Sequence, residues 1–302
     1  MNKKNLARRK LLQFLCTSPL LAGLTPLSLA AGSRDPALRP LPDELYPLIE
    51  SPDQALDVFD LQRVAEHVLP PAHYGYMATG TEGNETLRAN RKAFEKLYLR
   101  AMRMVDTSNI DTRLELLGEK LDSPIVLAPV SSQAAFHDEG EMAAARATGK
   151  SGHLQIVSNL TNFPIEDINQ ARATPAWMQL YPTQDFRVAT KMVQHAERAG
   201  CQVLVLTVDL HAGSKRTPLD RFIRQDTRDC EQCHDSSRPD NWLDRRPMYF
   251  DTGVEGSKFD TPEFTWDYLR QLRSITNMKL VIKGIVTAED ARDSVKHGVD
   301  AV

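Results

Sequence analysis

The fold is decided by residues 153–209, HLQIVSNLTNFPIEDINQARATPAWMQLYPTQDFRVATKMVQHAERAGCQVLVLTVD. Three short apolar runs alternate here with two segments of helical composition. The apolar runs are HLQIVSN (153–159), AWMQLY (176–181) and QVLVLTVD (202–209). Continuous apolar runs indicate strands buried on both faces, which occur in parallel sheets covered by helices. The stretch therefore predicts consecutive strand–helix units of an α/β protein.

The same pattern continues on both sides of this stretch. SPIVLAPV (123–130) precedes it, and KLVIKG (279–284) with the helix TAEDARDSVKHG (287–298) follows it. Five units at similar spacing, without a glycine-rich dinucleotide fingerprint, favour a (β/α)8 TIM barrel over an open doubly wound sheet. DAV (300–302) begins a sixth strand, so we expect an incomplete barrel, preceded by an N-terminal helical segment, whose remaining strands follow Val302.

The ends and composition of the chain suggest an exported globular protein. A hydrophobic share of 41%, a charged share of 25% and a net charge of −3 give no indication of nucleic-acid binding. Residues 1–31 have the basic start, apolar stretch and small residues of a cleaved signal peptide, and Arg8-Arg9 resembles a twin-arginine signal. An uncleaved membrane anchor is the alternative. We expect a proline-rich linker at 32–56, a folded domain at 57–302 and a periplasmic location.

Polar residues stand where the predicted strands end, which is where barrel enzymes carry their chemistry. These residues are Ser131, Ser158, Asn159, Gln179, Tyr181, Thr207, Asp209 and Lys283. A single Ser or Thr in such a place usually caps the next helix, but charges at the mouth of a barrel need partners or a ligand. The set as a whole predicts a bound polar cofactor.

Several motifs carry a resemblance to a known family. They include LPPAHYGYMATGTEGNETLRANRKAFEKLYLR (69–100), WMQLY (177–181), LTVD (206–209) and LVIKGIVTAEDARDSVKHG (280–298). From about Val58 to Val302 the chain resembles the FMN-dependent 2-hydroxy-acid dehydrogenases and oxidases, such as glycolate oxidase, lactate oxidase and flavocytochrome-type L-lactate dehydrogenase. The resemblance implies oxidation of a lactate-like L-2-hydroxy acid to the 2-oxo acid, with electrons passing to a quinone, a cytochrome or oxygen.

The resemblance also implies roles for individual residues. The flavin contacts would be Pro129, Val130 and Ser131 along the ring, Ser158, Gln179 and Thr207 at its polar edge, and Lys283 beside N1. The substrate contacts would be Tyr76 and Arg216 at the carboxylate and Tyr181 at the hydroxyl. Asp209 would orient a catalytic histidine. Leu160 and Ser131 depart from residues common in the family, so the substrate side chain stays open.

The catalytic histidine and a substrate-binding arginine of the family lie just after the sixth strand, beyond Val302. We therefore expect the chain as given to be inactive alone, and a non-catalytic partial gene product is an alternative reading. Relatives are often tetramers, so a homo-oligomer is also open.

One motif lies outside this resemblance. Cys230, Cys233 and His234 match the C-x-x-C-H signature of covalent haem c attachment, and a haem-bearing electron carrier is a further alternative. The segment from Arg216 to Lys283 is about as long as in relatives without haem. A disulfide, or a small redox or metal clip, is the other interpretation. No pair of histidines has convincing metal-ligand spacing.

Overall fold

The computed structural model describes residues 45–210, 214–228, 243, 246–253, 261 and 263–302. The chain divides into two compact units, residues 1–64 and 65–302. In the first unit, the 3-10 helix η4 (Pro52–Gln54) precedes α2 (Val58–Val68), which runs past the boundary. Tyr46 is buried and packs edge-on against Phe59, with ring centroids 6.4 Å apart. The described end of the predicted linker therefore contains local structure.

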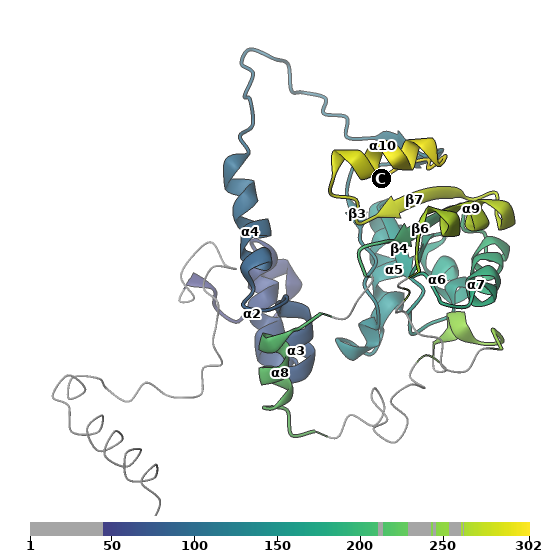
Figure 1. Cartoon of the computed structure of the whole chain (residues 1–302). Coiled ribbons are helices and arrows are strands. Elements are labelled where there is room, and N and C mark those ends of the chain that lie inside the picture. The colour runs from purple at the N-terminus through teal and green to yellow at the C-terminus, as the bar shows by residue number, and fades with distance from the viewer. Residues whose placement is uncertain (1–44, 211–213, 229–242, 244–245, 254–260, 262) are drawn as a thin grey trace, which may run out of the picture. The chain divides into compact units, whose positions relative to one another are not determined.

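The second unit contains a five-stranded parallel sheet whose strands follow chain order (Figure 1). The strands are β3 (Val126–Leu127), β4 (Leu154–Ser158), β5 (Trp177–Leu180), β6 (Val203–Thr207) and β7 (Lys279–Lys283). The helices that follow them are α5 (Gly140–Ser151), α6 (Ile165–Arg172), α7 (Phe186–Arg198), α9 (Trp266–Ile275, before β7) and α10 (Ala288–Lys296). Ala301 forms a parallel bridge with Val281, which places the start of a sixth strand beside β7. The predicted succession of strand–helix units is confirmed.

Helices pack against one face of this sheet because their apolar residues recur at helical spacing. In α7, Val188, Met192 and Ala196 are spaced four residues apart and are at most 1% exposed. They join alternate strand residues such as Leu204 and Leu206 in the main core. Side-chain caps fix where three of these helices begin: Asp185 for α7, Thr265 for α9 and Thr287 for α10.

The opposite face of the sheet is covered, at the amino ends of the strands, by a β-hairpin. Its antiparallel strands are β1 (Leu114–Leu116) and β2 (Glu119–Leu121). The two-residue turn has positive φ at Leu117 (51°) and Gly118 (90°), a conformation that glycine favours and that matches the twist of paired strands. Leucines of the hairpin form a second core with Leu154, Trp177 and Val203, the first residues of β4, β5 and β6.

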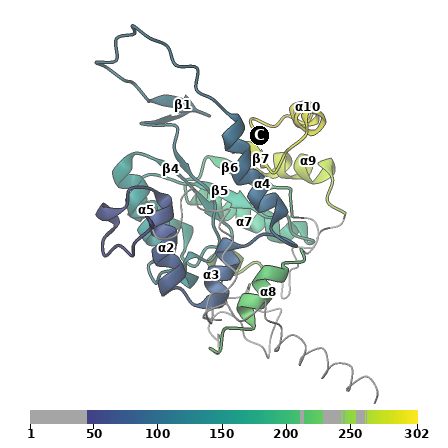
Figure 2. The same cartoon turned by 90° about the vertical axis from the view of Figure 1, so that its left-hand side faces the viewer.

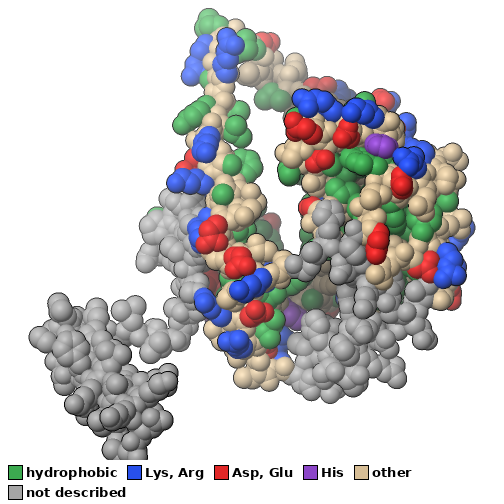
Figure 3. Space-filling view, in the orientation of Figure 1, with side chains coloured by type: hydrophobic (Ala, Val, Ile, Leu, Met, Phe, Trp, Pro, Cys, Tyr) green, Lys and Arg blue, Asp and Glu red, His purple; other side chains and the backbone are tan. Residues whose placement is uncertain are grey.

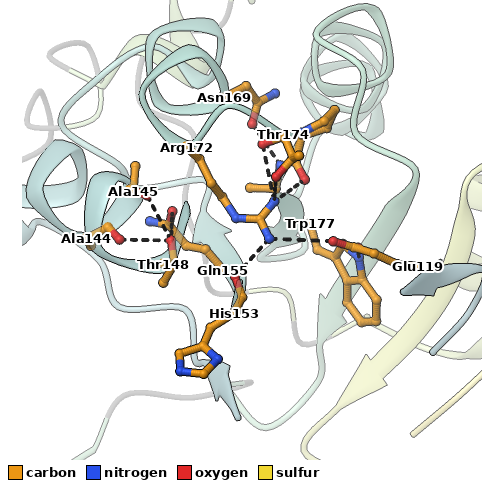
Figure 4. A network of polar contacts seen from close by, with 12 residues as sticks. Glu119, Ala144, Ala145, Thr148, His153, Gln155, Asn169, Arg172, Thr174 and Trp177 are labelled. Carbon is orange, nitrogen blue, oxygen red and sulfur yellow. Dashed lines mark hydrogen bonds and ion pairs between the residues drawn. The ribbon is translucent and has the colours of Figure 1, made fainter. Parts of the chain in front are cut away.

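A network of hydrogen bonds and an ion pair connects this hairpin to the sheet (Figure 4). Trp177 Nε1 donates to Glu119 Oε2 at 2.7 Å, and Arg172 Nη2 lies 3.5 Å from Glu119 Oε1. Arg172 is only 4% exposed and also donates to the carbonyl oxygens of His153 and Pro175, at 2.9 and 2.7 Å. Glu119 therefore connects the hairpin to two buried donors beside the amino ends of the strands.

The remaining elements lie before and between the strand–helix units. They are α3 (Pro71–Ala78), α4 (Glu85–Ala93), η5 (Phe94–Lys96), η6 (Gln133–Ala135), α8 (Thr217–Ile223) and η8 (Pro247–Tyr249). The chain between η5 and β1 has no regular structure (Figure 2). Large apolar side chains of this segment are exposed, among them Leu97, Tyr98 and Leu99. In Figure 3, hydrophobic and basic side chains alternate along the extended segment at the top of the view. Within the described ranges, no helix is both long and apolar enough to cross a membrane.

Candidate functional site

The sheet face that packs against the β1–β2 hairpin is apolar at the amino ends of the strands and polar at their carboxyl ends. Side chains two residues apart in a strand share a face. On β6, Val203 and Val205 therefore lie on the same face as Thr207, and the apolar side chains of the pair pack with the hairpin. The polar residues at the carboxyl ends of this face are Ser158, Gln179, Thr207 and Lys283. The strand register places Ser158 beside Gln179 and Thr207 beside Lys283. Four of the predicted flavin contacts therefore form one row across β4 to β7.

The neutral members of this row are buried and partly paired with each other. Ser158, Gln179 and Thr207 are each at most 2% exposed. Gln179 Nε2 donates to Thr207 Oγ1 at 2.9 Å, and Ser158 Oγ accepts from the backbone N of Leu160 at 3.2 Å. Both hydroxyl groups act as acceptors in these bonds, so each retains a proton that it can donate. Buried polar groups of this kind are costly unless they are hydrogen-bonded, which makes a polar ligand a suitable partner.

The charged residues of the site lie at the ends of β6 and β7. Lys283 Nζ is 3.7 Å from Asp209 Oδ1, and the two side chains are 40% and 52% exposed. The backbone N of Val208 donates to the carbonyl oxygen of Lys283 at 2.9 Å, which continues the pairing of the strands beyond their ends. Gly284 follows with a φ of 115°, and a Cβ there would lie 2.7 Å from Asp209 Cβ. The close approach of the two strand ends therefore requires glycine at this position.

Tyr181 is the first residue after β5 and is half-buried. Burial raises the pKa of its phenol above the ordinary value, and the neighbouring Tyr76 and Asp209 raise it further. The hydroxyl of Tyr181 therefore stays protonated at neutral pH and can donate a hydrogen bond. The predicted substrate contacts Tyr76 and Tyr181 lie within electrostatic range of each other and of Asp209.

Tyr76 and Arg216 are brought together by α3 and the start of α8. The guanidinium carbon of Arg216 lies 4.7 Å from the centroid of the Tyr76 ring. Arg216 Nη2 also donates to the carbonyl oxygens of Tyr76 and Thr79, at 2.6 and 2.5 Å. Arg216 thus donates to carbonyl groups at the carboxyl end of α3. Its contact with a substrate carboxylate stays a prediction.

The predicted flavin-lining segment Pro129–Ser131 follows β3. Val130 is 47% exposed, whereas Pro129 and Ser131 are of intermediate exposure. The next residue, Ser132, donates its backbone N to the carbonyl oxygen of Leu160 at 3.2 Å, so the chain after β3 is tied to the chain after β4. Leu160 itself is 7% exposed and belongs to the main core.

Some sequence-predicted groups cannot be placed. Cys230, Cys233 and His234 lie outside the described residues, as does the predicted signal peptide. Across the residues with described positions, no group of three or more His, Cys, Asp or Glu side chains is arranged to hold a metal ion. The sequence pattern places Asn159 among the polar residues at the strand ends but does not indicate Tyr249. Asn159 donates a hydrogen bond to the Tyr249 hydroxyl and accepts one from the backbone N of Tyr181.

Comparison with known proteins shows the family to which the chain belongs. Residues 65–302 match the model of a family described as FMN-dependent dehydrogenase. The chain belongs to the FMN-dependent dehydrogenase family. It is 30% identical to L-lactate oxidase of Lysinibacillus sphaericus over 252 residues, which cover 80% of this chain and 64% of that protein. Glycolate oxidase of Spinacia oleracea is 30% identical over 250 residues, covering 82% of this chain and 66% of the relative.

Solved structures of the family show the same fold. A crystal structure of mandelate oxidase with benzoylformic acid matches with a TM-score of 0.69 and 29% identity, over 82% of this chain and 67% of that chain. The α/β sheet of five parallel strands thus matches barrel oxidases over part of their length. The chain spans about two thirds of the length of the curated relatives that it matches.

Proposed function

We propose that the chain binds FMN at the carboxyl ends of its strands and serves the oxidation of a 2-hydroxy acid to the 2-oxo acid. The observation that carries this proposal is the row of Ser158, Gln179, Thr207 and Lys283 across four adjacent strands. When bound, FMN supplies the acceptor for the electron pair that leaves the substrate. The named relatives act on lactate, glycolate and mandelate, so a small 2-hydroxy acid is the proposed substrate class.

The donor set of the site suits a flavin ring. The pyrimidine edge of the ring carries both carbonyl acceptors and an N–H donor. Ser158, Thr207 and the carboxamide of Gln179 can donate and accept, so they suit such an edge. Lys283 brings a fixed positive charge to the same row, where it would stabilise negative charge that develops on reduction.

The substrate end of the site has complementary groups. Tyr181, kept protonated by burial, would donate a hydrogen bond to the substrate oxygen that changes from hydroxyl to carbonyl. Arg216 and Tyr76 would hold the substrate carboxylate. Asp209 would orient the base that removes the proton, as the family resemblance implies. A quinone, a cytochrome or oxygen would then take the electrons.

Two lysines on β7 provide a matched test of this proposal. Lys283 stands at the carboxyl end of the strand, and Lys279 stands at the amino end, where its Nζ lies 3.1 Å from Asp300. The chain is mixed with FMN, and binding is followed by quenching of flavin fluorescence. We expect the wild-type chain to bind FMN. In Lys283→Met, the midpoint potential of bound FMN should fall by on the order of 40 mV. This shift is equivalent to about 2 kcal/mol for the loss of a partly exposed charge.

The Lys279→Met variant is expected to leave both quantities unchanged. A wild-type chain that does not bind FMN contradicts the proposal. Equal potentials for the two lysine variants would remove Lys283 from the flavin site.

A further inference from the structure

Asn159 connects the two strands that carry the predicted flavin and substrate contacts. It follows β4 and is fully buried. Its backbone N donates to the carbonyl oxygen of Gln179 at 2.9 Å, and its side-chain Oδ1 accepts from the backbone N of Tyr181 at 3.3 Å. On its other side, Nδ2 donates to the hydroxyl oxygen of Tyr249 at 3.0 Å. The carboxamide is thus held between the end of β5 and η8.

Tyr249 can hold Asn159 because the segment Arg246–Thr252 is itself fixed to the rim of the sheet. Met248 and Tyr249 are 1% and 6% exposed and belong to the main core. Arg246 Nη2 donates to Ser132 Oγ at 2.9 Å, which ties the segment to the chain after β3. Lys191 Nζ on α7 donates to the carbonyl oxygens of Asp251 and Thr252, at 2.9 and 3.0 Å. Three separate parts of the unit therefore hold the segment.

The backbone beyond Tyr181 is held in a similar way. Two residues later, the backbone N of Thr183 donates to the hydroxyl oxygen of Tyr268 at 3.2 Å. Tyr268 in turn packs edge-on against Phe186 and Phe264, with ring centroids 5.1 Å apart in both pairs. Asn159 is thus the contact that fixes the backbone amide of Tyr181 itself, while Tyr268 fixes the turn that follows.

We propose that Asn159, held by Tyr249, is a positioning residue for Tyr181, and that the segment Arg246–Thr252 thereby sets the geometry at the substrate end of the site. The inference rests on the proposed function, because it gives Tyr181 a substrate to contact. Asn159 acts through the backbone of Tyr181 and through the neighbouring strand. Small displacements of a contacting group are costly in such sites: a shift of about 1 Å can reduce the rate on the order of a hundredfold.

The first test measures the backbone of Tyr181 directly and needs no cofactor. Hydrogen–deuterium exchange of the full 302-residue chain is followed in peptides covering residues 181–185. Asn159→Ala removes the acceptor for the Tyr181 amide, and the milder Tyr249→Phe keeps the ring but removes the hydroxyl that holds Asn159. We expect exchange in these peptides to become roughly three- to tenfold faster, as the loss of one buried hydrogen bond implies.

Thr148→Val is the matched control, because it also removes a buried hydroxyl group. Thr148 Oγ1 lies 2.9 Å from the carbonyl oxygen of Ala144 and 3.3 Å from Gln155 Oε1, near the amino end of the sheet (Figure 4). Its variant should leave exchange at 181–185 unchanged. Unchanged exchange in both Asn159→Ala and Tyr249→Phe overturns the inference, and so does an equal increase in Thr148→Val.

The second test separates positioning from cofactor binding. With FMN bound, pyruvate binding is read from the perturbation of the flavin absorption spectrum. Tyr249→Phe should weaken pyruvate binding several-fold and leave FMN affinity unchanged, because the side chains of Ser158, Gln179 and Thr207 are intact. Unchanged pyruvate affinity overturns the inference. A wild-type chain that binds no FMN refutes the proposed function instead, and the exchange experiment is independent of that result.

Discussion

Removing the carboxylate of Glu119 should destabilise the second unit without affecting the strand ends that form the candidate site. Glu119 accepts a 2.7 Å hydrogen bond from Trp177 Nε1 and lies 3.5 Å from Arg172, which is 4% exposed. A hydrogen bond to a charged group contributes about 1.5–3 kcal/mol. Arg172 keeps its other acceptors and the Glu119 side chain is 29% exposed, so the lost ion pair adds only about 1 kcal/mol. We therefore expect Glu119→Ala to lower the free energy of unfolding by about 3 kcal/mol.

Urea unfolding followed by tryptophan fluorescence and circular dichroism measures this loss. Glu115→Ala is the matched control, because Glu115 lies on the same hairpin but is exposed and pairs across the strands with Lys120. The control should change stability by less than about 0.5 kcal/mol. Glu119→Gln keeps an acceptor for Trp177 and should fall between the two. If Glu119→Ala and Glu115→Ala unfold at the same urea concentration, Glu119 does not lock the hairpin.

Two further predictions concern the core and the N-terminus. Burial raises the pKa of the Cys201 thiol from 9.0 to about 11, so above pH 9 the unfolded chain loses this proton while the folded chain keeps it. Stability should therefore fall by about 2 kcal/mol between pH 9 and 11 relative to Cys201→Ala, and parallel curves for the two proteins in urea unfolding would contradict this. The Arg8-Arg9 pair predicts export, so replacing both residues by lysine should leave the chain in the cytoplasm with its leader uncleaved. Fractionation and intact-mass measurement check this, and an unchanged periplasmic yield would exclude the twin-arginine route.

The strands and their polar ends could be predicted because they depend on local pattern. The apolar runs at 153–159, 202–209 and 279–284 contain strands β4, β6 and β7, which end at the polar residues Ser158, Thr207 and Lys283. Parallel strands in chain order bring their carboxyl ends to one edge, so a row of polar residues follows from the sequence. The start of a helix at Thr287 was similarly visible in the sequence, and Thr287 caps α10.

The contacts that could not be predicted join residues far apart in the chain. Asn159 and Tyr249 are 90 positions apart, and nothing local to either residue indicates the other. The helix α8 and the short η8 lie between β6 and α9, where the sequence analysis identified no strand or helix. The hairpin β1–β2 did have a signal, since Leu117-Gly118 separates two short runs of alternating residues, and a two-residue turn at this glycine would have predicted it.

The hairpin has a consequence for how such a protein can change over evolutionary time. It covers the amino ends of the strands with leucine side chains and the Glu119 network, and leaves the candidate site at the carboxyl ends. Selection on the ligand can then alter residues near the candidate site, such as Leu160 after β4 or Tyr249 in η8, while the contacts at the amino ends preserve the fold. Mutations at the two ends should accordingly combine with little epistasis, so that new specificity can arise in an unchanged scaffold.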